Sequence, residues 1–202
     1  MTIHEPATFA TDLLLAALGA FFVTRLRKDH RTGPAGKWWI RAMALMATSA
    51  LAGGCYHAVA PDLPPAIEAN SWRMVLWIIC GLGFAMGMSL LRELQPSRGR
   101  RAWEILLGVK LAISCGIVLA KPEFVIAMAD YGSAMLAWAI AALACKRQWS
   151  PAMLAGVGLS LLAGAVQQMQ WGLHRHFNHN DLFHVVQAFA LFAFYRAGKC
   201  LD

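Results

Sequence analysis

The chain has 202 residues, of which 58% are hydrophobic and only 14% are charged. Soluble domains are about half apolar and about a quarter charged, so this composition excludes an ordinary soluble domain. The net charge of +7 does not indicate a nucleic-acid partner, because the basic residues lie in short stretches between apolar runs. Five cysteines stand singly in apolar segments, and we expect small buried side chains there rather than disulfides or thiolate ligands.

Seven apolar runs follow one another along the chain, each long enough to cross about 30 Å of hydrocarbon as a helix. They lack the alternation of barrel strands, and lipid satisfies no open backbone, so helices are predicted. The chain is therefore expected to form one all-α domain, a bundle of seven transmembrane helices. In chain order the predicted spans are residues 8–23, 38–60, 72–91, 103–120, 124–145, 151–173 and 181–195.

The first run is expected to remain as a helix, because the basic stretch RLRKDHR follows it, whereas a signal peptide carries its positive charge in front. Basic residues also flank the third and fifth connections and the tail, all on one side of the predicted bundle. The positive-inside rule then predicts the N-terminus outside and the C-terminus in the cytoplasm, in a bacterial inner membrane. The residues on the basic side are Arg25, Arg27, Lys28, Arg31, Lys37, Arg41, Arg92, Arg98, Arg100, Arg101, Lys146, Arg147, Arg196 and Lys199.

Histidines gather where the second predicted span ends and the seventh begins. His57 lies near the outer end of the second span, and His184 lies one turn into the seventh. Because their depths match and ionisable groups inside spans usually face a functional interior, we expect these two imidazoles to meet. Asp181 precedes His184 by three residues and shares its helix face, and His179 stands just before. For the loop residues His174 and His176 we favour contacts with lipid headgroups.

Imidazole and carboxylate groups of this kind can hold zinc at about 2.0 to 2.2 Å and leave a fourth position for water. Such water has a pKa near 7 and is a ready nucleophile. The sequence therefore suggests a metal site formed by some of these residues.

Other polar residues inside or beside the spans have two interpretations each. Asp130 lies at a depth similar to that of the histidines, and it is either a proton acceptor or the partner of an ion pair with Lys110. Lys110 is expected to pair with Asp130 or with Asp12. Glu68 and Asp62 lie on the outer side, where they act in the site or are simply solvated. Four glutamines have two possible roles: they orient a ligand, or they form hydrogen bonds between helices, which is the more frequent role of glutamine in bundles. They are Gln167, Gln168, Gln170 and Gln187.

Seven spans, a histidine closing the second and a histidine near the start of the seventh resemble the CREST-type superfamily of membrane hydrolases. It includes alkaline ceramidases, progestin and adiponectin receptors, and proteins that remodel lipid anchors. Its pattern is a serine four residues before a histidine in helix two, an acid near helix three, and HxxxH at the start of helix seven. Here GGCYH supplies His57 and NDLFH supplies His184, while Gly53 stands at the serine position and Asn180 at the first histidine of HxxxH.

The resemblance implies a ceramidase-like, zinc-dependent hydrolase that cleaves a lipid amide or ester in the outer half of the bundle. It implies that His57 and His184 bind zinc together with Asp181 or His179, and that Glu68 stands for the family's acid. The N-out, C-in topology matches the ceramidase branch.

The sequence therefore allows two functions from different classes, an enzyme and a non-catalytic binding protein. In the favoured one, zinc-bound water attacks a lipid carbonyl while Asp130 or Glu68 moves protons. In the alternative, the protein is not catalytic and uses the same histidines to bind a ligand, a haem or a protein partner. A transporter is disfavoured, because no predicted span is broken and no two halves match.

Overall fold

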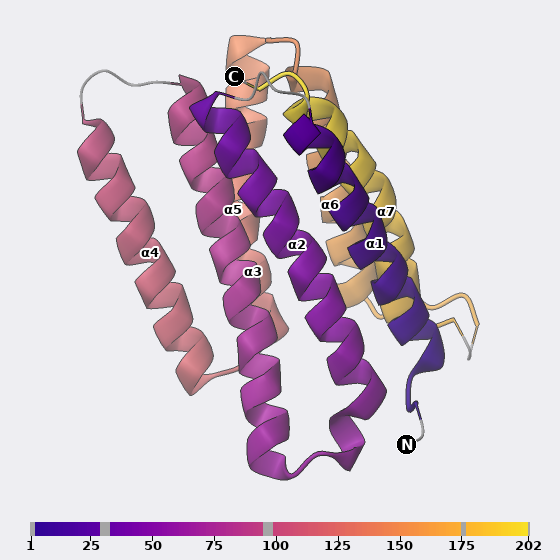
Figure 1. Cartoon of the computed structure of the whole chain (residues 1–202). Coiled ribbons are helices and arrows are strands. Elements are labelled where there is room, and N and C mark those ends of the chain that lie inside the picture. Colours follow the sequence, from indigo (N-terminus) through magenta and orange to yellow (C-terminus); the bar gives the residue numbers. More distant parts are fainter. Residues whose placement is uncertain (1–2, 29–32, 95–98, 175–176, 202) are drawn as a thin grey trace.

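The computed structural model describes residues 3–28, 33–94, 99–174 and 177–201. Arg31, Arg98 and His176, which the sequence analysis used, lie outside these residues. The described residues form seven long helices, which confirms the predicted all-α fold (Figure 1). Their bounds are α1 Pro6–Lys28, α2 Pro34–Val59, α3 Pro65–Leu94, α4 Arg100–Ala120, α5 Phe124–Cys145, α6 Ser150–Gln168 and α7 His179–Gly198, with a short 3-10 helix η1, Ala60–Asp62, after α2.

The helix ends differ from the predicted spans by five residues or more at three places, and at the first of them α1 continues to Lys28 rather than ending at residue 23. The sixth span is predicted to reach residue 173, but α6 ends at Gln168, because Gln170 adopts a positive φ of 53°, which ends an α-helix. The chain then forms a loop in which His174 and Phe177 pair as an isolated bridge. α3 begins seven residues earlier than predicted, at Pro65, since proline is well suited to the first turn of a helix.

Six helices, α1 to α6, are long and apolar enough to cross a membrane, so the chain is an integral, multi-pass membrane protein. Polar residues lower the hydropathy of α7, and three of them, Asp181, His184 and Gln187, are buried inside the bundle. α7 nevertheless packs along α1 and α6 as a helix of 20 residues. Large apolar side chains such as those of Leu136, Leu143 and Leu161 face outward, as lipid contact requires.

The helix ends separate the charges along the bundle. The C-terminal ends of α1, α3, α5 and α7 lie at one end of the bundle, opposite the N-terminal end of α1 (Figure 1). The basic residues of the described chain follow the same division, with Arg73 and Lys121 near the opposite end and Lys110 in the middle of α4.

α4 is the peripheral helix of the bundle. It packs against α3 and, over fewer residues, against α5, and it stands at the edge in Figure 1. Of its residues, Val118 alone is buried. The remaining six long helices therefore enclose the interior in which polar residues gather.

Candidate functional site

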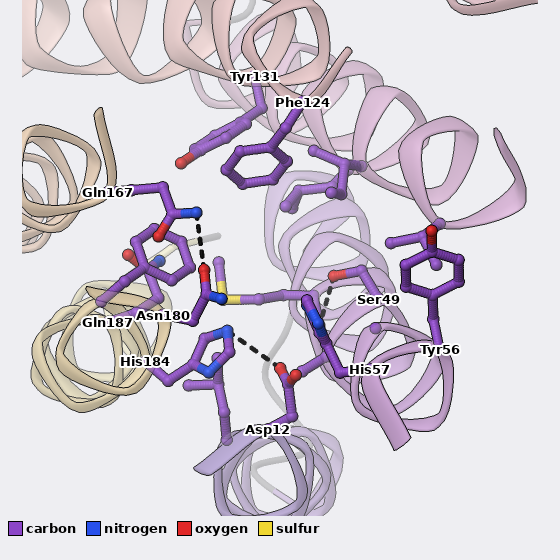
Figure 2. Close-up of a pocket in the computed structure, with 18 of the residues that line it drawn as sticks. Asp12, Ser49, Tyr56, His57, Phe124, Tyr131, Gln167, Asn180, His184 and Gln187 are labelled. Carbon is purple, nitrogen blue, oxygen red and sulfur yellow. Dashed lines mark hydrogen bonds and ion pairs between the residues drawn. The ribbon is translucent and has the colours of Figure 1, made fainter. Parts of the chain in front are cut away.

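A cavity of about 340 Å³ lies among the six helices other than α4 (Figure 2). One part of its wall carries polar side chains, and the other part is apolar and aromatic. The lining residues are Asp12, Leu15, Met46, Ser49, Ala50, Gly53, Tyr56, His57, Trp72, Val75, Ile79, Leu82, Phe124, Tyr131, Gln167, Asn180, Phe183, His184 and Gln187.

Small residues on α2 leave room for this cavity and let α1 come close. Ser49, Ala50 and Gly53 line the wall without filling it. A Cβ atom on Gly54 would lie 2.8 Å from Cβ of Asp12, so α1 can approach here only because residue 54 is glycine. A Cβ on Gly53 would meet Asp12 Oδ2 at an ordinary 3.8 Å. The contact of α1 with α2 therefore holds Asp12 at the cavity wall.

His184 is held through both of its ring nitrogens by two consecutive residues of α1. Its Nε2 lies 3.2 Å from Oδ1 of Asp12, and its Nδ1 lies 3.1 Å from Oγ1 of Thr11. The side chains of His184 and Asp12 are 10% and 4% exposed, so burial strengthens this contact relative to water. The pair fixes the imidazole on the cavity wall (Figure 2).

His57 lies on the same cavity wall, so the structure brings together the two histidines whose depth in the sequence matches. Its Nδ1 is 3.4 Å from Oε2 of Glu5, just before α1. The ring contacts Tyr56 and Trp72 edge-on, with centroid distances of 5.8 and 6.5 Å. The cavity wall thus has imidazoles from α2 and α7 and a carboxyl group from α1, while Glu5 contacts His57 without lining the cavity.

Asp181 and His179 do not join this group. Asp181 is fully buried, but its Oδ2 accepts the backbone N–H of Asn178 at 2.7 Å as part of a capping box that begins α7. The carboxylate therefore turns back toward the helix start, where capping is favourable. His179 is the first residue of α7, is partly exposed and lies outside the cavity lining.

The predicted ligand set of His57 and His184 with Asp181 or His179 is consequently not assembled. Across the described ranges, no three His, Cys, Asp or Glu side chains are arranged to hold a metal ion. The spacing of Asp181 and His184 gives a shared helix face, but the local cap competes for the carboxylate.

Asp130 forms a second buried cluster, away from the cavity lining. Its Oδ1 lies 2.8 Å from Nζ of Lys110 and accepts a hydrogen bond from Ser114. The predicted ion pair is therefore present, and it joins α4 to α5. Glu68 also lies off the cavity wall, where it accepts the hydroxyl of Tyr56 at 3.3 Å.

Sequence reasoning considered Asp12 only as a partner for Lys110 and so missed its place in the site. The available signal was its depth, because an acid inside a span requires a partner, and only tertiary packing determines which. For Gln167 and Gln187, the expected bonds between helices are present: Gln167 donates to Asn180 at 2.8 Å, and Gln187 donates to Ser160 at 3.3 Å.

Three buried oxygens in the residues of the cavity wall have no hydrogen-bond donor among the described residues. They are Asp12 Oδ2, Gln167 Oε1 and Gln187 Oε1. Buried polar atoms are normally satisfied, and these three are all acceptors. The wall is therefore chemically suited to a molecule or ion that offers hydrogen-bond donors or positive charge.

Comparisons with curated proteins and with solved structures give no match. A family profile matches residues 7–202, which include nearly all of α1 and every later helix. The chain belongs to DUF6962, a family of unknown function.

Proposed function

We propose that this protein binds one single-chain amphipathic molecule in the cavity between its helices. The polar group of the molecule lies against Asp12, His57 and His184, and its apolar chain extends between α2 and α3 along Val75, Ile79 and Leu82. A cavity of about 340 Å³ is within the usual size range of small-molecule sites, which are mostly apolar with a few convergent polar groups.

The observation that carries this proposal is the set of acceptor oxygens without donors on the cavity wall. Each such buried atom costs about 1–3 kcal/mol, so three together favour a bound partner. Two of the three are amide oxygens and the third belongs to a carboxyl group, so the polar group of the ligand is expected to offer N–H or O–H donors.

We further propose that the basic end of the bundle faces the cytoplasm, as the positive-inside rule predicts. The polar part of the cavity, near the N-terminus of α7 and the C-terminus of α2, then lies beneath the extracytoplasmic surface. A lipid of the outer leaflet reaches it with its headgroup at a suitable depth.

Mass spectrometry of the molecules retained by the protein through purification in detergent tests this proposal. The wild type is expected to retain one class of amphipathic molecule, and Asp12→Asn is expected to reduce its amount about tenfold or more, since hydrogen bonds to charged groups contribute about 1.5–3 kcal/mol. Asp130→Asn, a change of the same kind at a buried aspartate away from the cavity, is the control and leaves the bound molecules unchanged. Equal retention in Asp12→Asn and the wild type contradicts the proposal.

A second candidate is the zinc-dependent hydrolysis of a lipid amide or ester, and one distance favours it. The 3.2 Å between His184 Nε2 and Asp12 Oδ1 also suits the edge of a tetrahedral zinc site, which is about 3.3 Å for ligand bonds of 2.0–2.1 Å. In this version Asp12, His57 and His184, which all line the cavity, would hold the zinc in place of a set with Asp181 or His179. When bound, zinc would supply Lewis-acid chemistry for hydrolysis.

Metal analysis of the purified protein separates the two candidates. Hydrolysis predicts about one zinc per chain in the wild type and its loss in His57→Ala, His184→Ala and Asp12→Ala. His179→Ala is the matched control and keeps its metal. A visible spectrum of the same sample tests for haem, and a turnover screen against a lipid extract tests for cleavage. A wild type without bound metal rejects the zinc version and leaves the binding proposal standing.

A further inference from the structure

The apolar end of the cavity is closed by Met46 of α2 and Leu82 of α3. Both side chains line the cavity of about 340 Å³ and also a second cavity of about 10 Å³. The other residues around the small cavity, among them Trp39, Met43 and Phe194, do not line the large one. Met46 and Leu82 therefore form a partition between two spaces in the same bundle.

The position of the partition follows from one face of α2. His57, Gly53, Ala50 and Met46 succeed one another at intervals of three or four residues, and all four line the cavity. At a rise of 1.5 Å per residue, Met46 lies about 16 Å along the helix axis from His57. The small residues between them leave the space, and Met46 is the first large side chain of α2 that ends it.

The side chains around the small cavity differ in how firmly they are held. Methionine is unbranched and adapts its shape to its surroundings, and Met43 and Met86 lie beside Met46 around the small cavity. Trp39, which also lines the small cavity, is held by Phe194. Its Nε1 donates a hydrogen bond to the carbonyl of Phe194 at 3.1 Å, and the two rings pack edge-on with their centroids 5.7 Å apart.

We propose that Met46 is the end wall that sets the length of the apolar chain which the cavity accepts. This inference rests on the proposed binding of a single-chain amphipathic molecule. A chain of matching length ends against Met46 and Leu82. A longer chain is excluded, because the small cavity of about 10 Å³ has no room for a displaced methionine side chain.

Photolabelling with straight-chain 1-alkanols that carry a diazirine at the terminal carbon measures this length. The alcohol donates a hydrogen bond at the polar end, and the labelled residue, identified by mass spectrometry, reports where the chain ends. In the wild type we expect an optimum length and labels at Met46 and Leu82. In Met46→Ala the optimum lengthens by about two methylenes, and the longer probe labels about fifteenfold more strongly than in the wild type, because each buried methylene contributes about fourfold in affinity. The labels then move to Met43, Trp39 and Phe194.

Two further variants complete the test. Met46→Phe shortens the optimum, which gives an independent result if the alanine variant does not fold. Met153→Ala removes the same side chain from a fully buried position in α6 outside the cavity, and it leaves the optimum unchanged. Labelling of cavity residues with one optimum length in all variants overturns the role of Met46. An absence of labelling at the cavity lining in the wild type overturns the proposed binding itself.

Discussion

Two buried aspartates in membrane helices have very different surroundings in this protein. Asp130 is paired with a cation, because Lys110 Nζ and Ser114 both contact its Oδ1, and its Oδ2, although also without a donor among the described residues, lies off the cavity wall. Asp12 lies on the cavity wall, with one oxygen on His184 and the other without a donor. An acid in a span is thus not by itself evidence of a site. The distinction lies in whether its charge is already neutralised by a nearby cation and whether it faces open space.

The largest expected effect on stability concerns Asp130 and its ion pair with Lys110. Lys110→Ala leaves the Asp130 carboxylate buried without its cation, and we expect the free energy of unfolding to fall by about 3 kcal/mol. Equilibrium unfolding of the purified protein in mixed micelles measures this change. The double variant Lys110→Met, Asp130→Leu removes both charges and is expected to recover most of the loss. A single variant as stable as the wild type shows that the pair does not hold α4 to α5.

The next largest effect on stability is expected where α3 packs closely against α5. A Cβ on Gly83 would clash with the Asp130 carboxylate and lie 3.0 Å from Cα of Tyr131, whereas a Cβ on Gly132 would meet nothing within 4 Å. Gly83→Ala should therefore lower the free energy of unfolding by about 2 kcal/mol through overpacking. Gly132→Ala, measured by the same unfolding experiment, changes it little. Equal effects at the two glycines contradict the packing of α3 against α5.

Adjacent glycines on α2 test the packing at the cavity side in the same way. Gly54→Ser brings a Cβ within 2.8 Å of Asp12 Cβ, while Gly53→Ser keeps an ordinary 3.8 Å contact with the carboxylate. We expect Gly54→Ser to cost about 1–3 kcal/mol of stability and Gly53→Ser to be tolerated. Thermal unfolding in detergent compares the two. If Gly53→Ser is the more damaging change, Asp12 does not sit where the structure places it.

The smallest effect concerns the amide pair between α6 and α7. Gln167→Leu removes its hydrogen bond to Asn180, which contributes about 0.6 kcal/mol between membrane helices on average. Stability should therefore change little, while retention of the amphipathic ligand falls if the amide also contacts it. Gln168→Leu, on an exposed neighbour, is the control for both readouts. A loss of several kcal/mol in Gln167→Leu alone would make the pair a structural element rather than part of a binding wall.

Most of the fold could be predicted from the sequence, because seven apolar runs separated by basic or proline-containing stretches leave few alternatives in lipid. The convergence of His57 and His184 on one cavity also followed from their depth along two helices. Two predictions failed for other reasons. The sequence does not show toward which side of its helix a side chain such as Asp12 points, nor that a local cap takes up the carboxylate of Asp181. Asp12 faces the cavity because α1 packs against the small residues of α2, and Asp181 turns to Asn178 because a capping box is available within its own helix.

Native mass spectrometry of the wild type and of Ala50→Phe tests the central claim most directly. Ala50 lies on the cavity wall and is 6% exposed, so a phenyl ring there fills the space that the ligand would occupy. The account predicts one amphipathic molecule bound per wild-type chain and none on Ala50→Phe, with both proteins folded by circular dichroism. Equal occupancy of the two proteins would show that the cavity is not the binding site.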